Sequence, residues 1–186
     1  RRAERDLDEA RVLDLAGEHQ DRNARAVLAI TDQLRSLGWK IPEAAVSHGL
    51  AHVRTNTGFA GRWQIIAQDP CTIVDVGHNE DGLRVVRRML AITPHERLHV
   101  VLGTVNDKDI GRMLMQFPTN ATYYFCKADI PRGLEAADLA DRAAAAGLAG
   151  SVYGSVKDAL IAARRSAGPK DLVLVTGSVF TVAEVL

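Results

Sequence analysis

From Arg62 onward, short apolar runs alternate with segments of helical spacing. This alternation limits the fold most, because strand–helix–strand repeats favour parallel pairing with helices packed over the sheet. The runs at 99–102 and 171–175 are apolar enough for central strands. We predict an α/β fold, a Rossmann-like, mainly parallel sheet with helices on both faces. The expected strands are 63–67, 71–76, 98–103, 121–126, 151–153 and 171–176, and the expected helices are 79–91, 108–116, 135–146 and 156–166.

The first third of the chain has a helical pattern instead. Residues 21–37 repeat apolar side chains close to every 3.6 positions, and Pro42 opens a second short helix at 43–53. The polar, turn-rich segment 54–58 then marks a boundary. We therefore predict a helical segment at 1–57 and an α/β domain at 58–186. Because the chain opens on charged residues without Met, we expect it to be a piece of a longer protein.

The charge balance gives no support for a nucleic-acid or membrane partner. Lys and Arg number 23, and so do Asp and Glu, which leaves a formal net charge of zero. No stretch approaches the length of a membrane span, and the amino terminus has no signal-peptide core. Cys71 and Cys126 lie in apolar, strand-like runs, and we expect two buried thiols in a reducing cytosol. The predicted location is the cytoplasm.

The turn after the strand at 71–76 carries the side chains best suited to chemistry. Asp75 lies near the strand's carboxyl end, Gly77 permits a tight turn, and His78 and Asn79 lead into a helix. Ligands of open α/β sheets bind where strands end and helices begin. An acid, an imidazole and an amide are poor core material, so we predict a site for a nucleotide or an acyl phosphate. If Ser178 follows a neighbouring strand, it should lie at the same edge as Asp75.

Other familiar site patterns are absent from the sequence. No segment has the Gly-Lys-[Ser/Thr] ending of a P-loop, and none has Gly-x-Gly-x-x-Gly. His48 and His52 have helical i, i+4 spacing but lack a nearby third ligand, so we predict no metal site in this chain.

Five motifs, in order along the chain, resemble those of the folylpolyglutamate and dihydrofolate synthases, relatives of the Mur ligases. The resemblance covers nearly the whole chain. The central motif departs from the commoner Asp-Gly-Ala-His-Asn-Pro of that family at Val76, Gly77 and Glu80. The motifs are Gly17-Glu-His-Gln-Asp-Arg-Asn23, Gly61-Arg-Trp63, Asp75-Val-Gly-His-Asn79, Gly103-Thr-Val-Asn-Asp-Lys-Asp109 and Leu174-Val-Thr-Gly-Ser-Val-Phe180.

The resemblance implies an ATP-dependent ligase that joins L-glutamate to the carboxylate of a dihydropteroate or folate through an acyl phosphate. Residues 1–57 would be the tail of the central ATPase domain, and 58–186 the carboxy-terminal domain. The upstream ATPase part would supply the P-loop and the Mg²⁺ ligands.

The same resemblance implies nucleotide contacts. Asp75 would accept the ribose hydroxyls, Arg62 would contact phosphate, and Asn23, one turn from Gln20, would meet the adenine edge. The structural alternatives are a turn cap for Asp75, a surface side chain for Arg62 and ordinary polar helix surface for Asn23.

A second set of residues would hold the amino acid and the reacting groups. His78 would donate to phosphate or orient the attacking amine, and it is our catalytic and substrate-binding candidate. Backbone N–H groups at Gly177 and the Ser178 hydroxyl would hold the amino-acid carboxylate. The alternatives are local hydrogen bonding for His78 and, for Asn79, a purely structural role in the turn. For Lys108 we favour a salt-linked loop.

Two other functions fit parts of the pattern. One is a cell-wall Mur ligase, although no Asp-Asn-Pro-Arg motif is present. The other is a non-catalytic α/β binding module, which would suit a chain without a P-loop.

Overall fold

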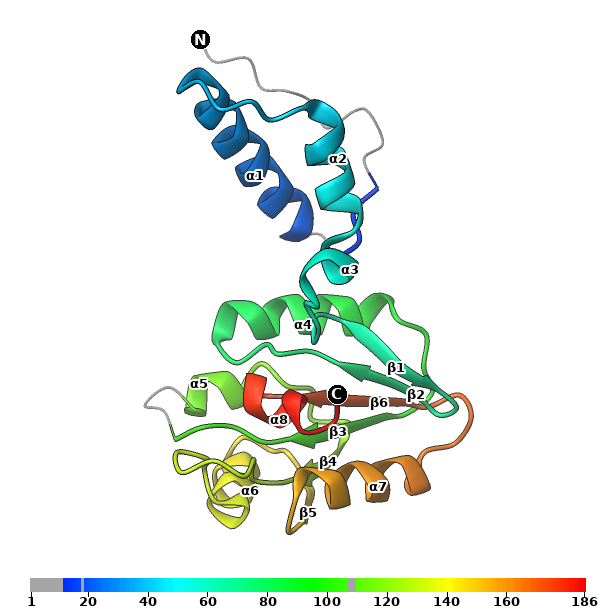
Figure 1. The fold of residues 1–186 in the computed structure, drawn as a ribbon. Helices are drawn as coiled ribbons and strands as arrows, with labels where there is room; N and C mark the ends of the chain where they lie inside the picture. The colour runs from blue at the N-terminus through cyan, green and yellow to red at the C-terminus, as the bar shows by residue number, and fades with distance from the viewer. Residues whose placement is uncertain (1–11, 18, 107–109) are drawn as a thin grey trace. The chain divides into compact units, whose positions relative to one another are not determined.

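The structure is a computed structural model that describes residues 12–17, 19–106 and 110–186. The chain divides into two compact units, Arg1–Ala60 and Gly61–Leu186, a few residues after the predicted boundary. The first unit is helical and the second combines strands with helices (Figure 1).

The described part of the first unit contains α1 (His19–Ser36), α2 (Glu43–Ala51) and α3 (Val53–Thr57). Arg35 fixes the connection between α1 and α2, because its Nε donates to the Ile41 carbonyl at 2.8 Å and its Nη2 lies 3.0 Å from Glu43 Oε2. The helices predicted at 21–37 and 43–53 are present, although the second is interrupted at His52.

Residues 54–57 differ from the prediction of a turn-rich segment, because they belong to α3. The helix ends at Gly58, whose φ of +66° places it in the left-handed region. Its N–H donates to the Arg54 carbonyl at 2.8 Å. A left-handed glycine closes a helix at no steric cost, so a polar stretch without apolar periodicity still forms one helical turn here.

The second unit is built on a six-stranded sheet with the order β1-β2-β6-β3-β4-β5. All neighbouring pairs are parallel except β1 with β2, which are joined by Asp69 and Pro70 alone and therefore pair antiparallel. The predicted mainly parallel α/β fold is confirmed, with β2, β6 and β3 as inner neighbours. The strands are β1 (Gln64–Gln68), β2 (Cys71–Val74), β3 (Leu98–Leu102), β4 (Thr122–Phe125), β5 (Gly150–Val152) and β6 (Leu172–Thr176).

The strand order decides which helices cover which face. The connections from β2 to β3, β3 to β4 and β4 to β5 step in one direction, whereas β5 to β6 steps back. Because parallel crossovers are right-handed, the forward helices share one face and the return helix lies on the other. One core accordingly contains side chains of α4 (Glu80–Ile92), α5 (Ile110–Leu114) and α6 (Ala136–Ala145). The other contains side chains of α7 (Val156–Ser166) and α8 (Val179–Ala183).

Successive residues of the inner strands point into these two cores in turn. Ile73 and Val100 belong to the core with α4, and their neighbours Val74 and Val101 belong to the core with α7. All four are almost fully buried. Burial on both faces explains why the inner strands are continuous apolar runs rather than alternating ones.

Side chains cap the starts of two helices. Ser155 caps α7, since its Oγ accepts from the Asp158 N–H at 3.0 Å. Asn79 caps α4, because it has extended backbone and its Oδ1 accepts from the Gly82 N–H at 2.8 Å. The short helix α8 was not predicted. Among the described residues, no helix is both long and apolar enough to cross a membrane.

A buried polar cluster lies at the amino-terminal edge of the sheet. The Asp171 carboxylate, just before β6, accepts from Arg97 Nη2 and from the Gly168 N–H, each at 2.7 Å. His99 connects it to β4, with Nε2 at 3.3 Å from Asp171 and Nδ1 at 2.9 Å from the Tyr124 hydroxyl. The hydrogen bonds from Arg97 and Gly168 hold the pKa of Asp171 well below its usual range, against the opposing effect of burial.

We predict that Asp171→Asn lowers the midpoint of thermal unfolding by several degrees at pH 7. A carboxyl whose pKa is depressed by folding stabilises the native state above its unfolded pKa of about 3.9, and this contribution is lost as the pH falls below that value. The difference in unfolding midpoint between the variant and the unchanged chain should therefore narrow as the pH falls from about 4 to about 2. Circular dichroism melts across this range test it, with Asp141→Asn on the exposed side of α6 as the control. A deficit independent of pH would contradict the prediction.

Candidate functional site

The carboxyl ends of the five parallel strands lie at the edge opposite the Asp171 cluster. After β2 and β3 the chain enters α4 and α5 on one face, whereas after β6 it enters α8 on the other. Neighbouring strands whose connections leave to opposite faces open a crevice between their ends, where ligands of open α/β sheets bind. The topology therefore places a crevice at the ends of β2, β6 and β3.

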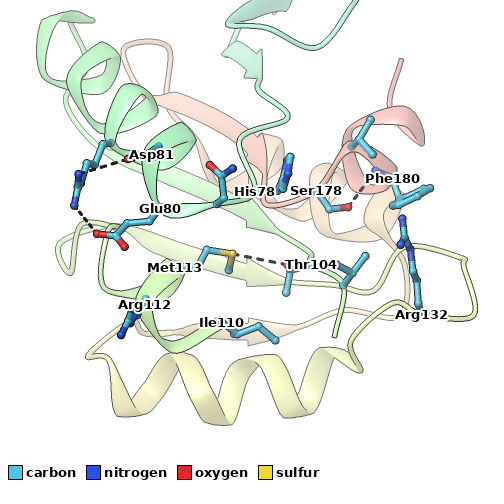
Figure 2. A pocket seen from close by; sticks show the side chains of 14 residues that line it. His78, Glu80, Asp81, Thr104, Ile110, Arg112, Met113, Arg132, Ser178 and Phe180 are labelled. Atoms are coloured by element: carbon cyan, nitrogen blue, oxygen red, sulfur yellow. Dashed lines mark hydrogen bonds and ion pairs between the residues drawn. The ribbon is translucent and has the colours of Figure 1, made fainter. Parts of the chain in front are cut away.

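A pocket of about 560 Å³ lies at this point, within the usual range for small-molecule sites. Its walls come from the turn after β2 with the start of α4, the loop after β3 with α5, the loop after β4, and the turn after β6 (Figure 2). The lining residues are His78, Asn79, Glu80, Asp81, Arg84, Thr104, Val105, Ile110, Arg112, Met113, Arg132, Ser178, Val179 and Phe180.

Asp75 joins the end of β2 to the turn before β1. Its Oδ2 accepts from the Trp63 N–H at 2.9 Å, and its Oδ1 accepts from the Gly77 N–H at 2.8 Å. Arg62 Nη1 lies 3.9 Å from the same Oδ1. Because Trp63 has a φ of +40°, the hydrogen bond from its N–H to Asp75 holds a left-handed turn that non-glycine residues seldom adopt. The buried carboxylate thus fills the structural role of turn cap.

His78 is an exposed side chain on the pocket wall. Its Nδ1 lies 3.0 Å from the Val76 carbonyl, which only accepts hydrogen bonds, so Nδ1 carries the proton. In the neutral imidazole, Nε2 is then an acceptor. An Nε2 acceptor suits an ammonium or amine ligand, whereas donation to a phosphate would require the protonated ring.

The turn after β6 requires glycine and is closed by serine. Gly177 has a φ of +103°, and a Cβ there would lie 2.5 Å from the Gly103 carbonyl oxygen. Ser178 Oγ accepts from the N–H groups of Phe180 and Thr181, both at 3.1 Å, and so caps α8. Thr181 Oγ1 donates to the Gly103 carbonyl at 2.9 Å. The turn after β6 is thereby bound to the end of β3.

The charged side chains of the pocket differ in their partners. Arg84 pairs with Glu80 at 2.5 Å and with Asp81 at 3.5 Å, so its positive charge is balanced by carboxylates in the same wall of the pocket (Figure 2). Arg132 instead packs its guanidinium over the Phe180 ring at 4.7 Å from the centroid. Since the lining contains three arginines, Arg112 included, and two carboxylates, it favours an anionic ligand.

Of the predicted amino-acid site, the structure brings His78 and Ser178 together in the pocket. Gly177 does not line it but shapes the turn that holds Ser178. The expected shared edge is present, because Asp75 follows β2 and Ser178 follows the parallel neighbour β6. Lys108, for which a salt-linked loop was favoured, lies outside the described residues.

The predicted nucleotide contacts are not in the pocket wall. Asp75 and Arg62 lie next to each other at the end of β2. Asn23 belongs to α1 in the first unit, where its Nδ2 donates to Gln20 Oε1 at 3.0 Å. The nucleotide roles of these residues therefore remain predictions.

Sequence reasoning missed several residues of the pocket. Arg112 lies on the short α5, and Arg132 lies in the loop after β4. Arg132 could have been found from the turn at Pro131–Gly133, which follows an apolar strand. The loops after parallel strands all lie at the same edge of the sheet, where ligands bind. Phe180 was quoted only as part of a closing motif.

Thiol chemistry does not fit this edge of the sheet. Cys126 follows β4, and burial raises its pKa to about 12, with Glu184 adding to the effect. Such a thiol is protonated at neutral pH and is not nucleophilic. Within the described ranges, no three His, Cys, Asp or Glu side chains gather in a way that would hold a metal ion.

Residues 61–179 match the family described as Mur ligase, glutamate ligase domain. The chain belongs to the Mur ligase family. The match contains all six strands and every turn that lines the pocket.

Curated relatives come from bacteria and archaea. The dihydrofolate synthase/folylpolyglutamate synthase of Escherichia coli is 33% identical over 166 residues, covering 88% of this chain and 37% of that protein. A probable bifunctional folylpolyglutamate synthase/dihydropteroate synthase of Haloferax volcanii is 35% identical over 171 residues, covering 91% of this chain and 20% of that protein. This chain therefore spans well under half the length of these relatives.

Solved structures agree with this assignment. Escherichia coli FolC in complex with DHPP and ADP has a TM-score of 0.72 and 33% identity, over 88% of this chain and 37% of that one. A bifunctional folylpolyglutamate synthase/dihydrofolate synthase with Mn, AMPPNP and L-glutamate bound has a TM-score of 0.76 and 27% identity, over 94% of this chain and 39% of that one.

We predict that Gly177→Ala destabilises the chain by about 2 kcal/mol or more, because the new Cβ meets the Gly103 carbonyl at a positive φ. Gly111→Ala on α5 is the matched control, since a Cβ there has nothing within 4 Å. It should be neutral or slightly stabilising. Urea unfolding of both variants measures the difference, and equal midpoints would show that the turn is not constrained as described.

Proposed function

We propose that this chain is the carboxy-terminal part of a cytoplasmic ATP-dependent ligase that joins L-glutamate to the carboxylate of a dihydropteroate or folate. Membership of the Mur ligase family and the names of the relatives support this reaction. The folate branch is favoured over cell-wall synthesis because these relatives are folylpolyglutamate synthases. In this proposal residues 1–57 are the tail of the central ATPase domain, whose upstream part supplies the P-loop and the Mg²⁺ ligands.

The observation that carries the proposal is a net cationic pocket at the switch point of the sheet with His78 on its wall. A dicarboxylic amino acid needs cations for its carboxylates and a hydrogen-bond acceptor for its amino group. Arg112 and Arg132 of the lining supply the cations, and Nε2 of His78 supplies the acceptor. Ser178 lines the same pocket and is our further contact for the amino acid.

The proposed reaction has two steps. The pterin-linked carboxylate attacks the γ-phosphorus of ATP, which gives an acyl phosphate and ADP. The glutamate amine then attacks the acyl carbon, phosphate leaves with the C–O bonding pair, and the amine loses a proton. An acceptor at His78 Nε2 would hold the amine N–H so that its lone pair faces the acyl carbon, a contribution of orientation.

We propose that ATP binds on the β2 side of this pocket. Arg62 carries the charge for a phosphate, and Asp75 next to it would accept the ribose hydroxyls. Asn23 would contribute an amide to the adenine.

In the full-length ligase, we predict that His78→Ala lowers kcat by about tenfold to a thousandfold, with little change in the apparent affinity for ATP. The reason is that the imidazole holds the attacking amine and has no proposed contact with ATP. Glutamate-dependent phosphate release, with ATP and glutamate varied separately, measures the effect. His95→Ala, a variant outside the pocket lining, is the control. Full activity of a folded His78→Ala enzyme would remove this residue from the mechanism, and absence of glutamate-dependent ATP use in the unchanged enzyme would refute the function.

We predict that Asp75→Asn weakens ATP use by about tenfold to a hundredfold, the range expected when hydrogen bonds to a charged group are lost. Because Asp75 also holds the turn at Trp63, the same variant should lower the unfolding midpoint of this chain without any nucleotide. Arg62→Gln separates the two effects, since it leaves both backbone bonds of Asp75 in place. It should weaken ATP use with a smaller change in stability. Normal ATP kinetics for Arg62→Gln would argue against a phosphate contact at this position.

A further inference from the structure

The loop after β4 holds Arg132 by its backbone at the mouth of the pocket. The Arg132 carbonyl accepts from the Asn106 N–H at 3.0 Å, and Gly133 forms a β-bridge with Val105. A Cβ at Gly133 would lie 2.8 Å from the Ala128 carbonyl, so the loop is tightly folded here. These contacts fix the residue against the loop after β3, which forms another wall of the same pocket.

A second attachment joins this loop to α8. The Asp129 N–H donates to Glu184 Oε1 at 2.6 Å, just beyond the end of that helix. Since α8 also carries Phe180, the loop and the ring under the arginine are positioned by one element. The guanidinium of Arg132 is therefore supported from the backbone and from the ring.

The contact with the Phe180 ring decides which atoms of Arg132 remain available to a ligand. The centre of the guanidinium lies 4.7 Å from the Phe180 centroid. Figure 2 shows Arg132 and Phe180 next to each other, with Ser178 nearby. The Phe180 ring offers a π face and no carboxylate, so this contact forms no salt bridge with the guanidinium N–H donors. Those donors form the fork that recognises a carboxylate through two parallel hydrogen bonds.

Arg132 differs in this respect from Arg84. The charge of Arg84 is already compensated by Glu80 and Asp81 on its own helix. Across the described ranges 12–17, 19–106 and 110–186, Arg132 is in no salt bridge, and its contact is the Phe180 ring. It is thus a positioned cation whose donors suit an anion that enters the pocket.

We propose that Arg132 binds the side-chain carboxylate of the incoming amino acid and so selects L-glutamate over neutral amino acids. This inference rests on the proposed function, and it assigns the specificity of that step to one residue. With the amine held at His78, a second carboxylate is the group that distinguishes glutamate from its neutral isostere, glutamine.

The test compares binding of L-glutamate and L-glutamine to this chain by titration of its ¹⁵N–¹H spectrum. The unchanged chain should prefer glutamate, and Arg132→Gln should lose that preference by about tenfold to a hundredfold, as for one charged hydrogen-bonded pair. Arg132→Lys should retain part of it, because lysine keeps the charge but not the fork. Arg165→Gln is the control, since it lies in the last turn of α7, which leads to the opposite edge of the sheet.

The outcomes separate this proposal from the function on which it rests. Equal preference for glutamate in Arg132→Gln and the unchanged chain, with the fold intact by circular dichroism, would overturn it. So would an unchanged chain that binds neither amino acid or both equally. The chain could prefer glutamate through Arg132 while the full-length protein shows no glutamate-dependent use of ATP. That result would support the carboxylate site and refute the proposed ligase function.

Discussion

The position of β6 between β2 and β3 determines the rest of the second unit. It forces the return connection through α7 onto the face opposite α4, α5 and α6, because crossover connections between parallel strands are right-handed. It also places strand ends side by side from which the chain continues to opposite faces of the sheet. The pocket lies between these diverging connections. Without the insertion of β6, β2 and β3 would both send their helices to the same face, and the crevice between their ends would close.

The residues that make the motifs recognisable mainly build the turns. Asp75 accepts two backbone N–H groups, Asn79 caps α4 and Ser178 caps α8. Thr176 and Thr181 then connect one turn to the next through the carbonyls of Gly77 and Gly103. This network satisfies buried polar groups at the strand ends. It leaves His78 and the arginines as the side chains directed to a ligand, held by a rigid rim.

Much of the architecture could be predicted because the inner strands are buried on both faces. Runs such as 99–102 and 171–175 have no other stable location than the middle of a covered sheet. The shared edge of Asp75 and Ser178 followed from parallel pairing alone. Local details were harder, because α3 and α8 are five residues each and too short to show a period.

The site was predicted less completely than the fold, for a physical reason. A motif identifies residues at a turn, but whether a side chain faces the pocket or its own backbone depends on hydrogen bonds that sequence does not show. Asp75 and Asn79 face their turns, and His78 between them faces outward. Arg132 was missed because its role comes from an unpredictable neighbour, the Phe180 ring.

The central strand of this sheet is also the last one to be synthesised. During translation β2 and β3 emerge early, yet each needs β6 as its partner, and almost a hundred residues separate β2 from β6. The nascent sheet is therefore split into a β1–β2 hairpin and a β3–β4–β5 group until residues 172–176 leave the ribosome. A premature stop before this segment removes the middle of the sheet and not an edge, so truncated chains expose unpaired strands and aggregate.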